Sequence, residues 1–195
     1  MILALARTLL QAAGLSSTTM RDDFDHQLLL ERFLTSQSDQ DFEPLFVSLY
    51  PRLRRFFLLH GVPRDVCEEL VQDVLLIVYR RAHTVRDRAL FMGWAFKVAR
   101  NRLIRQVQQD RRDAPLEATS AAANTPAAPP GGQLEEWMCC LDESSRQIVL
   151  LRFVEDLSYV EIAQALDLPL GTVKWKLFDA KARLARYLKE LEVVK

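Results

Sequence analysis

Two short stretches of the sequence concentrate positive charge and could bind a polyanion. Residues 97–112 carry six basic side chains and one acidic one, as do residues 174–189, so each stretch is net +5. The whole chain has a formal net charge of zero, so the positive charge of these two stretches is balanced by acidic side chains elsewhere in the chain. Cationic side chains hold phosphates, and the amide of Asn101 can both donate and accept a hydrogen bond at a base edge. On charge alone, a solvated helix face explains the two stretches equally well.

The side chains that usually carry catalysis or bind metals form no such pattern. Cys67, Cys139 and Cys140 show neither a C-x-x-C spacing nor a histidine partner, so we interpret them as reduced, partly buried thiols of a cytoplasmic protein. The three histidines lie far apart in the sequence. The sequence contains no nucleophile and base pair, phosphate-binding loop or metal cluster. We therefore expect no enzymatic activity, no cofactor and no metal site.

The N-terminal residues are apolar, but they do not predict a membrane segment. No stretch of the chain reaches the roughly 18 apolar residues that a membrane-spanning helix needs. Met1–Leu15 contains a single Arg7 and weakly resembles a secretory signal, yet no clear cleavage site follows it. Met20 precedes a polar, acidic start. We interpret residues 1–19 as a frayed amphipathic extension, or as the product of an upstream start codon, rather than as a signal peptide.

A segment rich in Ala, Pro and Gly divides the chain into two parts. Residues 113–133 show no apolar period and include a Pro-Pro-Gly-Gly run that would break any helix. We interpret this segment as a flexible linker between a domain at residues 41–112 and a second domain at residues 134–195. Residues 1–40 would form an N-terminal extension and the start of the first helix. Strictly alternating apolar runs are absent, so we expect an all-α fold of two small helical domains.

Three helices are predicted in the first domain. The first has apolar residues at helical spacing from Phe42 to Phe57, with a kink at Pro51, and it ends at Gly61. Pro63 suits the first turn of the next helix, at about residues 64–82. A third helix, at about residues 90–111, interleaves aromatic and apolar residues with the basic residues of the first stretch.

The second domain has the sequence features of a helix-turn-helix. Asp142 is a predicted N-cap, and Ser158 with Glu161 predicts a capping box that opens a short helix. The sequence DLPLG at residues 167–171 stops that helix, and a longer helix with a basic exposed face follows from about Thr172. A short helix, a tight turn with Pro and Gly, and a longer basic helix is the layout of this DNA-binding motif.

The second domain also closely resembles the promoter-binding domain of extracytoplasmic-function sigma factors, the initiation subunits of bacterial RNA polymerase. The strongest markers are LSYVEIAQAL at residues 157–166 and PLGTVK at residues 169–174. The resemblance implies that the last helix lies in the major groove of the minus-thirty-five element, where all four base pairs can be distinguished. The residues at positions that resemble the DNA-facing ones of the family are Arg152, Thr172, Lys174, Trp175, Lys176, Phe178, Asp179 and Lys181.

The first domain resembles the polymerase-binding and promoter-melting domain of the same family. The resemblance lies in EELVQDVLLIVYRR at residues 68–81 and WAFKVARNRL at residues 94–103. It implies that one helix face docks on the clamp helices of the largest catalytic polymerase subunit, through Glu69, Gln72, Asp73, Leu76 and Tyr79. It also implies that the next helix meets the minus-ten DNA, with an amide reading a flipped base and cations holding phosphates, through Trp94, Lys97, Arg100, Asn101, Arg102 and Arg105.

Some of these residues also fit a purely structural role in the helical domain. The partners follow only from the resemblance. Seen in isolation, Glu69, Gln72 and Asp73 fit a solvated helix face, and Trp94 fits the core of a small helical bundle. The implied partners are core RNA polymerase, including the flap of its second-largest subunit, promoter DNA, and in some members of the family an anti-sigma factor. No membrane partner is expected.

Several residues depart from the pattern of the family. Asp179 stands where the recognition helix usually has a basic residue, Trp175 replaces a smaller polar residue, and Arg105 replaces a frequent acid. Val66-Cys67 replaces part of an acidic stretch. These departures concern the promoter sequence that would be read. Two other interpretations stay open: a helix-turn-helix regulator whose first half senses a ligand or dimerises, and a sigma-like adaptor that does not read DNA.

Overall fold

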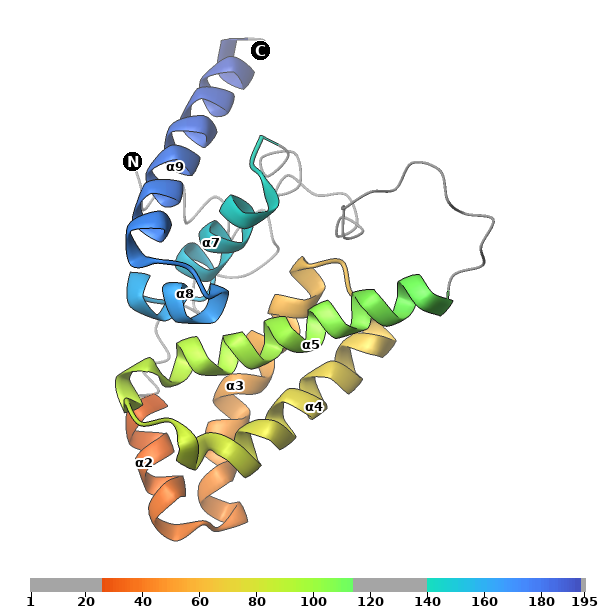
Figure 1. Cartoon of the computed structure of the whole chain (residues 1–195), viewed down its shortest axis with the longest axis vertical. Helices are drawn as coiled ribbons and strands as arrows, with labels where there is room; N and C mark the ends of the chain where they lie inside the picture. The colour runs from red at the N-terminus through yellow and green to blue at the C-terminus, as the bar shows by residue number, and fades with distance from the viewer. Residues whose placement is uncertain (1–25, 114–139, 194–195) are drawn as a thin grey trace. The chain divides into compact units, whose positions relative to one another are not determined.

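The computed structural model describes residues 26–113 and 140–193, which are helical apart from short turns (Figure 1). Within these ranges there is no β-strand, so the predicted all-α fold is confirmed. The described residues belong to two compact units, one containing residues 26–113 and the other residues 140–193. The predicted N-terminal extension up to residue 25, and the predicted linker beyond residue 113, lie outside the described residues.

The first unit begins with α2 (His26–Ser36), a separate helix that the sequence patterns did not predict. Leu30 and Phe33 are buried and lie three residues apart, so they share one face of the helix. The Phe33 ring lies 5.0 Å from the ring of Phe42, in the next helix. The unit therefore starts before residue 41, the boundary expected from the sequence.

The next two helices begin and end at residues that the sequence marks. The side chain of Ser38 caps α3 (Asp39–Leu59) by accepting a hydrogen bond from a backbone N–H of the first turn, and the helix continues through Pro51. Gly61 follows with a φ of 74°, in the left-handed region that glycine adopts without steric cost. α4 (Arg64–Arg81) starts directly after Pro63, as predicted.

Two 3₁₀ turns, η2 (Ala82–Thr84) and η3 (Arg88–Leu90), lead into α5 (Phe91–Asp113), which lies alongside α4 (Figure 1). Each long helix buries one face at spacings of three and four residues, and the opposite face is left for solvent or a partner. The core of the unit includes buried side chains from four helices: Leu30 from α2, Leu45, Leu49, Leu53 and Phe57 from α3, Cys67, Val71, Val74 and Val78 from α4, and Phe91, Ala95, Phe96 and Ala99 from α5.

The second unit contains α7 (Glu143–Phe153), α8 (Tyr159–Leu166) and α9 (Leu170–Val193). Both predicted caps are confirmed. The Asp142 carboxylate accepts a hydrogen bond from the Ser145 backbone N–H, at 2.7 Å, and Ser158 and Glu161 form a complete capping box. α9 begins at Leu170, two residues before the position expected from the sequence, and α7, α8 and α9 share a core that includes Ile148, Leu151, Ile162, Val173, Leu177 and Leu184.

Candidate nucleic-acid and protein interfaces

The outward face of α4 carries three of the five residues predicted to bind polymerase. Glu69, Gln72 and Leu76 are exposed, and their spacing of three and four residues places them in one row, which we call the α4 stripe. The opposite face of α4 is fixed in the core by Val71 and Val74, which are fully buried. The helix therefore presents an acid, an amide and an apolar side chain together on a surface whose orientation the core determines.

Asp73 lies at the edge of the α4 stripe that borders α5. Its Oδ2 atom lies 3.1 Å from Nη1 of Arg102, and the two side chains are 41% and 30% exposed. The ion pair thus joins a residue predicted to bind polymerase with a residue predicted to bind DNA. No spacing in the sequence indicated this contact.

Tyr79 lies at the opposite edge, where α4 borders α2 and α3. Its hydroxyl donates a hydrogen bond of 2.8 Å to Oδ1 of Asp39, and its ring lies 5.0 Å from Phe42 and 5.4 Å from Phe33. The hydrogen bond to the Asp39 carboxylate raises the pKa of Tyr79, because the neutral phenol is the form that donates. The position of this ring is therefore fixed by the unit itself, and part of it remains exposed.

An aromatic row on α3, which the resemblance did not indicate, borders the α4 stripe. The rings of Phe46 and Tyr50 are stacked with centroids 5.7 Å apart, and Phe42 meets Phe46 edge-on at 6.4 Å. Phe42 also contacts Tyr79 of α4. Phe46 is exposed, whereas its sequence spacing placed it within the apolar repeat of α3 and gave no signal of exposure.

Glu68, the neighbour of Glu69, is directed toward α3 and away from the α4 stripe. Its carboxylate accepts hydrogen bonds from the Tyr50 hydroxyl and, at 2.9 Å, from Nε of Arg54. These two bonds hold the pKa of Glu68 below its ordinary value. Glu68 therefore fastens α4 to α3, and Glu69 is the acid of this pair that stays available to a partner.

Three of the predicted DNA-binding residues form one outward row on α5. Lys97, Asn101 and Arg105 follow one another at intervals of four residues, so they lie on the same side of the helix, and we call them the α5 row. Asn101 and Arg105 are exposed and Lys97 is half-buried. An amide that could read a base thus lies between two cations that could hold phosphates.

The other predicted residues of α5 are less accessible than Asn101 and Arg105. Trp94 is half-buried, and its ring lies 6.0 Å from that of Phe91, so it is neither a fully buried core residue nor a freely exposed one. Arg100 is also half-buried. Arg102 is turned toward α4 by its ion pair with Asp73.

On α9, three predicted DNA-binding residues point outward. Trp175 and Phe178 are 63% and 74% exposed, and Lys174 is exposed beside them. Val173 and Leu177 on the opposite side are buried, which fixes the orientation of the helix. Two adjacent exposed aromatic rings with a cation form a surface that can contact thymine methyl groups, base edges and phosphates. Thr172, in the first turn, is half-buried.

Three other predicted DNA-binding cations of this unit make contacts within it. Lys176 donates to the carboxylate of Asp142 at 3.4 Å, and the Lys181 ammonium lies 5.5 Å from the centroid of the Phe153 ring. Arg152 donates to the backbone carbonyl of Leu157 at 2.9 Å, and it also pairs with Asp156 and lies over Tyr159. Each of these side chains therefore helps to hold helices or turns of the unit together.

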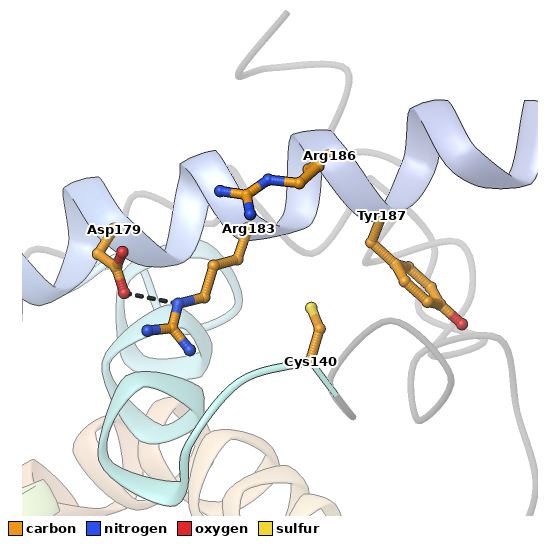
Figure 2. A pocket seen from close by; sticks show the side chains of 5 residues that line it. All are labelled: Cys140, Asp179, Arg183, Arg186 and Tyr187. Atoms are coloured by element: carbon orange, nitrogen blue, oxygen red, sulfur yellow. Dashed lines mark ion pairs between the residues drawn. The ribbon is translucent and has the colours of Figure 1, made fainter.

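Asp179 is paired with a cation from the next turn of α9. Its Oδ2 lies 2.7 Å from Nε of Arg183 (Figure 2). Both line an open cavity of about 440 Å³ together with Arg186, Tyr187 and Cys140, whose thiol points toward α9 (Figure 2). The resemblance did not assign Arg183 or Arg186 to DNA, although both belong to the second positively charged stretch. The pair offsets the negative charge of Asp179 on this surface.

Among the described residues, no group of His, Cys, Asp and Glu side chains is arranged to hold a metal ion. Cys67 is buried, and burial raises the pKa of its thiol. Cys140 is half-buried, and Cys139 lies outside the described residues. No helix in the described ranges is both long and apolar enough to cross a membrane.

Both units match family models. The model for Sigma-70 region 2 matches residues 45–113, and the model for Sigma-70, region 4 matches residues 132–184. The first match contains the α4 stripe and the α5 row, and the second contains the helix-turn-helix. Together the two matches cover more than half of the chain, in the order predicted from the sequence.

Curated relatives match over nearly their whole length. The chain is 27% identical, over 179 residues, to the ECF RNA polymerase sigma factor RpoE of Cereibacter sphaeroides, covering 88% of this chain and 99% of the relative. It is 28% identical, over 182 residues, to the ECF RNA polymerase sigma-E factor of Escherichia coli K12, covering 83% of this chain and 93% of the relative.

Two solved structures share the fold. CnrH, in complex with the cytosolic domain of CnrY, matches with a TM-score of 0.61 at 21% identity, over 85% of this chain and 97% of the solved one. The sigma factor RpoE of Bartonella quintana, in complex with the anti-sigma factor NepR, matches with a TM-score of 0.55 at 22% identity, over 77% of this chain and 98% of the solved one.

Proposed function

The chain belongs to the extracytoplasmic-function sigma factors of the sigma-70 family, and from that premise we propose which of its surfaces serve each step of promoter-specific transcription initiation. A sigma factor is a non-catalytic subunit that directs RNA polymerase to promoters. The interpretation as a ligand-sensing or dimerising regulator is not favoured, because the first unit matches sigma region 2.

The α4 stripe is the proposed docking surface for core RNA polymerase, on the clamp helices of its largest catalytic subunit. The observation that carries this proposal is the joint exposure of Glu69, Gln72 and Leu76 on a helix whose other face is fixed in the core. Asp73 and Tyr79 lie at the two edges of this surface. The aromatic row of α3 would enlarge it, since exposed aromatic side chains are enriched at protein interfaces.

The α5 row is the proposed surface for the minus-ten DNA. Melting requires a base to leave the stack, which costs a few kcal/mol and is offset by contacts to the exposed base. Asn101 is the proposed reader of that base, because its amide is exposed and can donate and accept at once. Lys97 and Arg105 would hold the neighbouring phosphates, and Trp94 and Arg100 would contribute less, since both are half-buried.

The outward face of α9 is the proposed reader of the minus-thirty-five element. Lys174, Trp175 and Phe178 would make the direct contacts, since they are the predicted residues that point outward. Contact with the minus-thirty-five DNA remains a proposal for four further residues, Thr172, Lys176, Lys181 and Arg152. In the last three, that role competes with contacts inside the unit. We assign residues 26–113 to the polymerase-binding and melting domain and residues 140–193 to the domain that recognises the upstream element.

An anti-sigma factor is a further proposed partner, together with the flap of the second-largest polymerase subunit. The support is that the Bartonella quintana relative was solved in complex with an anti-sigma factor. The exposed Trp175 and Phe178 offer an apolar surface that a protein inhibitor could cover in competition with DNA.

Run-off transcription with core polymerase on a library of promoter fragments tests the proposed function as a whole. Replacing Gln72 and Asp73 together by Ala should weaken co-purification with core polymerase and leave helicity unchanged. Unchanged binding of this double variant would refute the role of the α4 stripe. Promoter-specific transcripts that depend on the chain would exclude a sigma-like adaptor that does not read DNA.

Asp179 provides a separate test of the docking of α9. If its carboxylate accepts a hydrogen bond from a cytosine amino group, Asp179→Arg should change the preferred base pair, with a loss of roughly 1 to 3 kcal/mol of discrimination. If Asp179 only repels phosphates, the same change should strengthen binding to all sequences and steepen the salt dependence. Affinities for upstream-element variants at two salt concentrations distinguish these results, and no change in either would place Asp179 outside the DNA interface.

A further inference from the structure

The ion pair between Asp73 and Arg102 joins two helices to which the proposed function gives different partners. Oδ2 of Asp73 on α4 and Nη1 of Arg102 on α5 lie 3.1 Å apart. At this distance the guanidinium and the carboxylate form an ion pair, in which opposite charges attract each other directly. Arg102 therefore lies where it could contribute either to polymerase binding through α4 or to minus-ten DNA binding through α5.

Arg102 does not lie in the α5 row. Lys97, Asn101 and Arg105 are spaced by four residues and share one side of α5, whereas Arg102 is one residue further on than Asn101, about 100° around the helix. That rotation brings Arg102 to the side of α4, where its side chain is 30% exposed. A nucleic acid lying along the α5 row would meet Lys97 and Arg105 before it met Arg102.

We propose that Arg102 serves polymerase binding, as a positioning residue that holds the Asp73 carboxylate at the edge of the α4 stripe. The inference rests on the proposed function of that stripe. A carboxylate on a helix surface samples several rotamers, and ordering it when a partner binds costs free energy. The ion pair with Arg102 favours one rotamer of Asp73 in the free protein, so the polymerase meets a carboxylate that is already in place.

The expected effect is modest, because both side chains are partly exposed and solvent screens the pair. Arg102→Gln should weaken the affinity for core polymerase by about two- to fivefold, the usual range for a surface ion pair. Arg102→Lys keeps the positive charge and should recover part of this loss. Neither change should alter the fold, since Arg102 contributes no buried apolar side chain.

A titration of the labelled full-length chain with core RNA polymerase measures the effect. Asp73→Ala, Arg102→Gln and the double variant form a cycle, and we expect Arg102→Gln to cause no further loss once Asp73 has been replaced. Arg105→Gln is the matched control, because it removes the same side chain from the α5 row. It should leave polymerase affinity unchanged and weaken the binding of the holoenzyme to minus-ten DNA. Circular dichroism and thermal melting check that every variant is folded.

Three results would overturn the inference. One is an unchanged polymerase affinity for Arg102→Gln. Another is a loss of minus-ten DNA binding as large as that of Arg105→Gln. The third is an equal effect of Arg102→Gln with and without Asp73. Gln72→Ala tests the proposed role of the α4 stripe separately from the role of Arg102. If Gln72→Ala weakens polymerase binding and Arg102→Gln does not, the proposal for the α4 stripe is retained and only the role of Arg102 is wrong.

Discussion

Replacing Phe178 by alanine should impair DNA binding much more than folding. Its side chain is 74% exposed, so folding buries only about a quarter of it. Full burial of a phenylalanine stabilises a protein by about 1.5 to 3 kcal/mol, so the expected loss of stability is below about 1 kcal/mol. In a unit of this size such a loss lowers the melting temperature by a few degrees.

The expected loss of DNA affinity is larger because most of the ring remains to be buried. An aromatic side chain buries roughly 150 to 250 Å² when fully covered. If DNA covers about half of the exposed part, at about 25 cal/mol per Å², the contact contributes about 1.5 to 2 kcal/mol. Affinity for the upstream element should therefore fall by roughly 10- to 30-fold.

Thermal melting and fluorescence anisotropy with a labelled upstream duplex measure the two quantities on the same protein. Leu184→Ala is the control for a change that affects folding, because Leu184 is only 1% exposed and lies on the buried side of α9. It should cost about 2 to 5 kcal/mol of stability. Unchanged DNA affinity for Phe178→Ala would refute the docking of this face of α9. A melting temperature lowered as far as that of Leu184→Ala would contradict the exposure of Phe178.

Three further predictions concern stability and melting. Asp142→Ala removes the cap on the Ser145 N–H and should destabilise the second unit by about 1 kcal/mol in chemical denaturation, whereas Asp142→Asn should retain most of this stability. The pKa of Glu68 is lowered in the folded protein, so its hydrogen bonds stabilise the first unit fully above about pH 4.5 and less as the pH falls below that value. In Glu68→Gln the melting temperature should therefore depend less on pH in this acidic range. Asn101→Ala should leave upstream duplex binding nearly normal and reduce permanganate reactivity of the minus-ten bubble, and an unaltered reactivity would make Asn101 a structural helix residue.

The sequence predicts the features of this fold that depend on neighbouring residues. The caps at Asp142 and Ser158 are examples, because each side chain bonds a backbone N–H only three residues away. Apolar spacing likewise predicts α3, α4 and α5 with ends that differ by at most three residues from the observed ones. α2 was not predicted, because Leu30 and Phe33 are its only buried residues and they form too short a repeat to stand out from the apolar N-terminus.

The contacts that decide the role of individual site residues could not be predicted in the same way. Lys176 contacts Asp142 and Arg102 contacts Asp73, and each pair joins residues that are distant in the sequence and meet only once the helices are packed. A motif identifies the type of surface to which a residue belongs. Only the packing of the helices shows whether its side chain points to a partner or to another helix.

The packing of α2 makes the surface that we propose for polymerase binding sensitive to proteolysis in the turn between α2 and α3. The Phe33 ring supports both Phe42 and Tyr79, yet it is linked to α3 through Gln37, an exposed residue with a φ of 51°. A protease that cut at Gln37 would leave α4 and its sequence intact but would free α2 to dissociate. Tyr79 would then lose one of its two aromatic neighbours, so a cut outside the α4 stripe would lower the amount of active factor without removing any residue of that stripe.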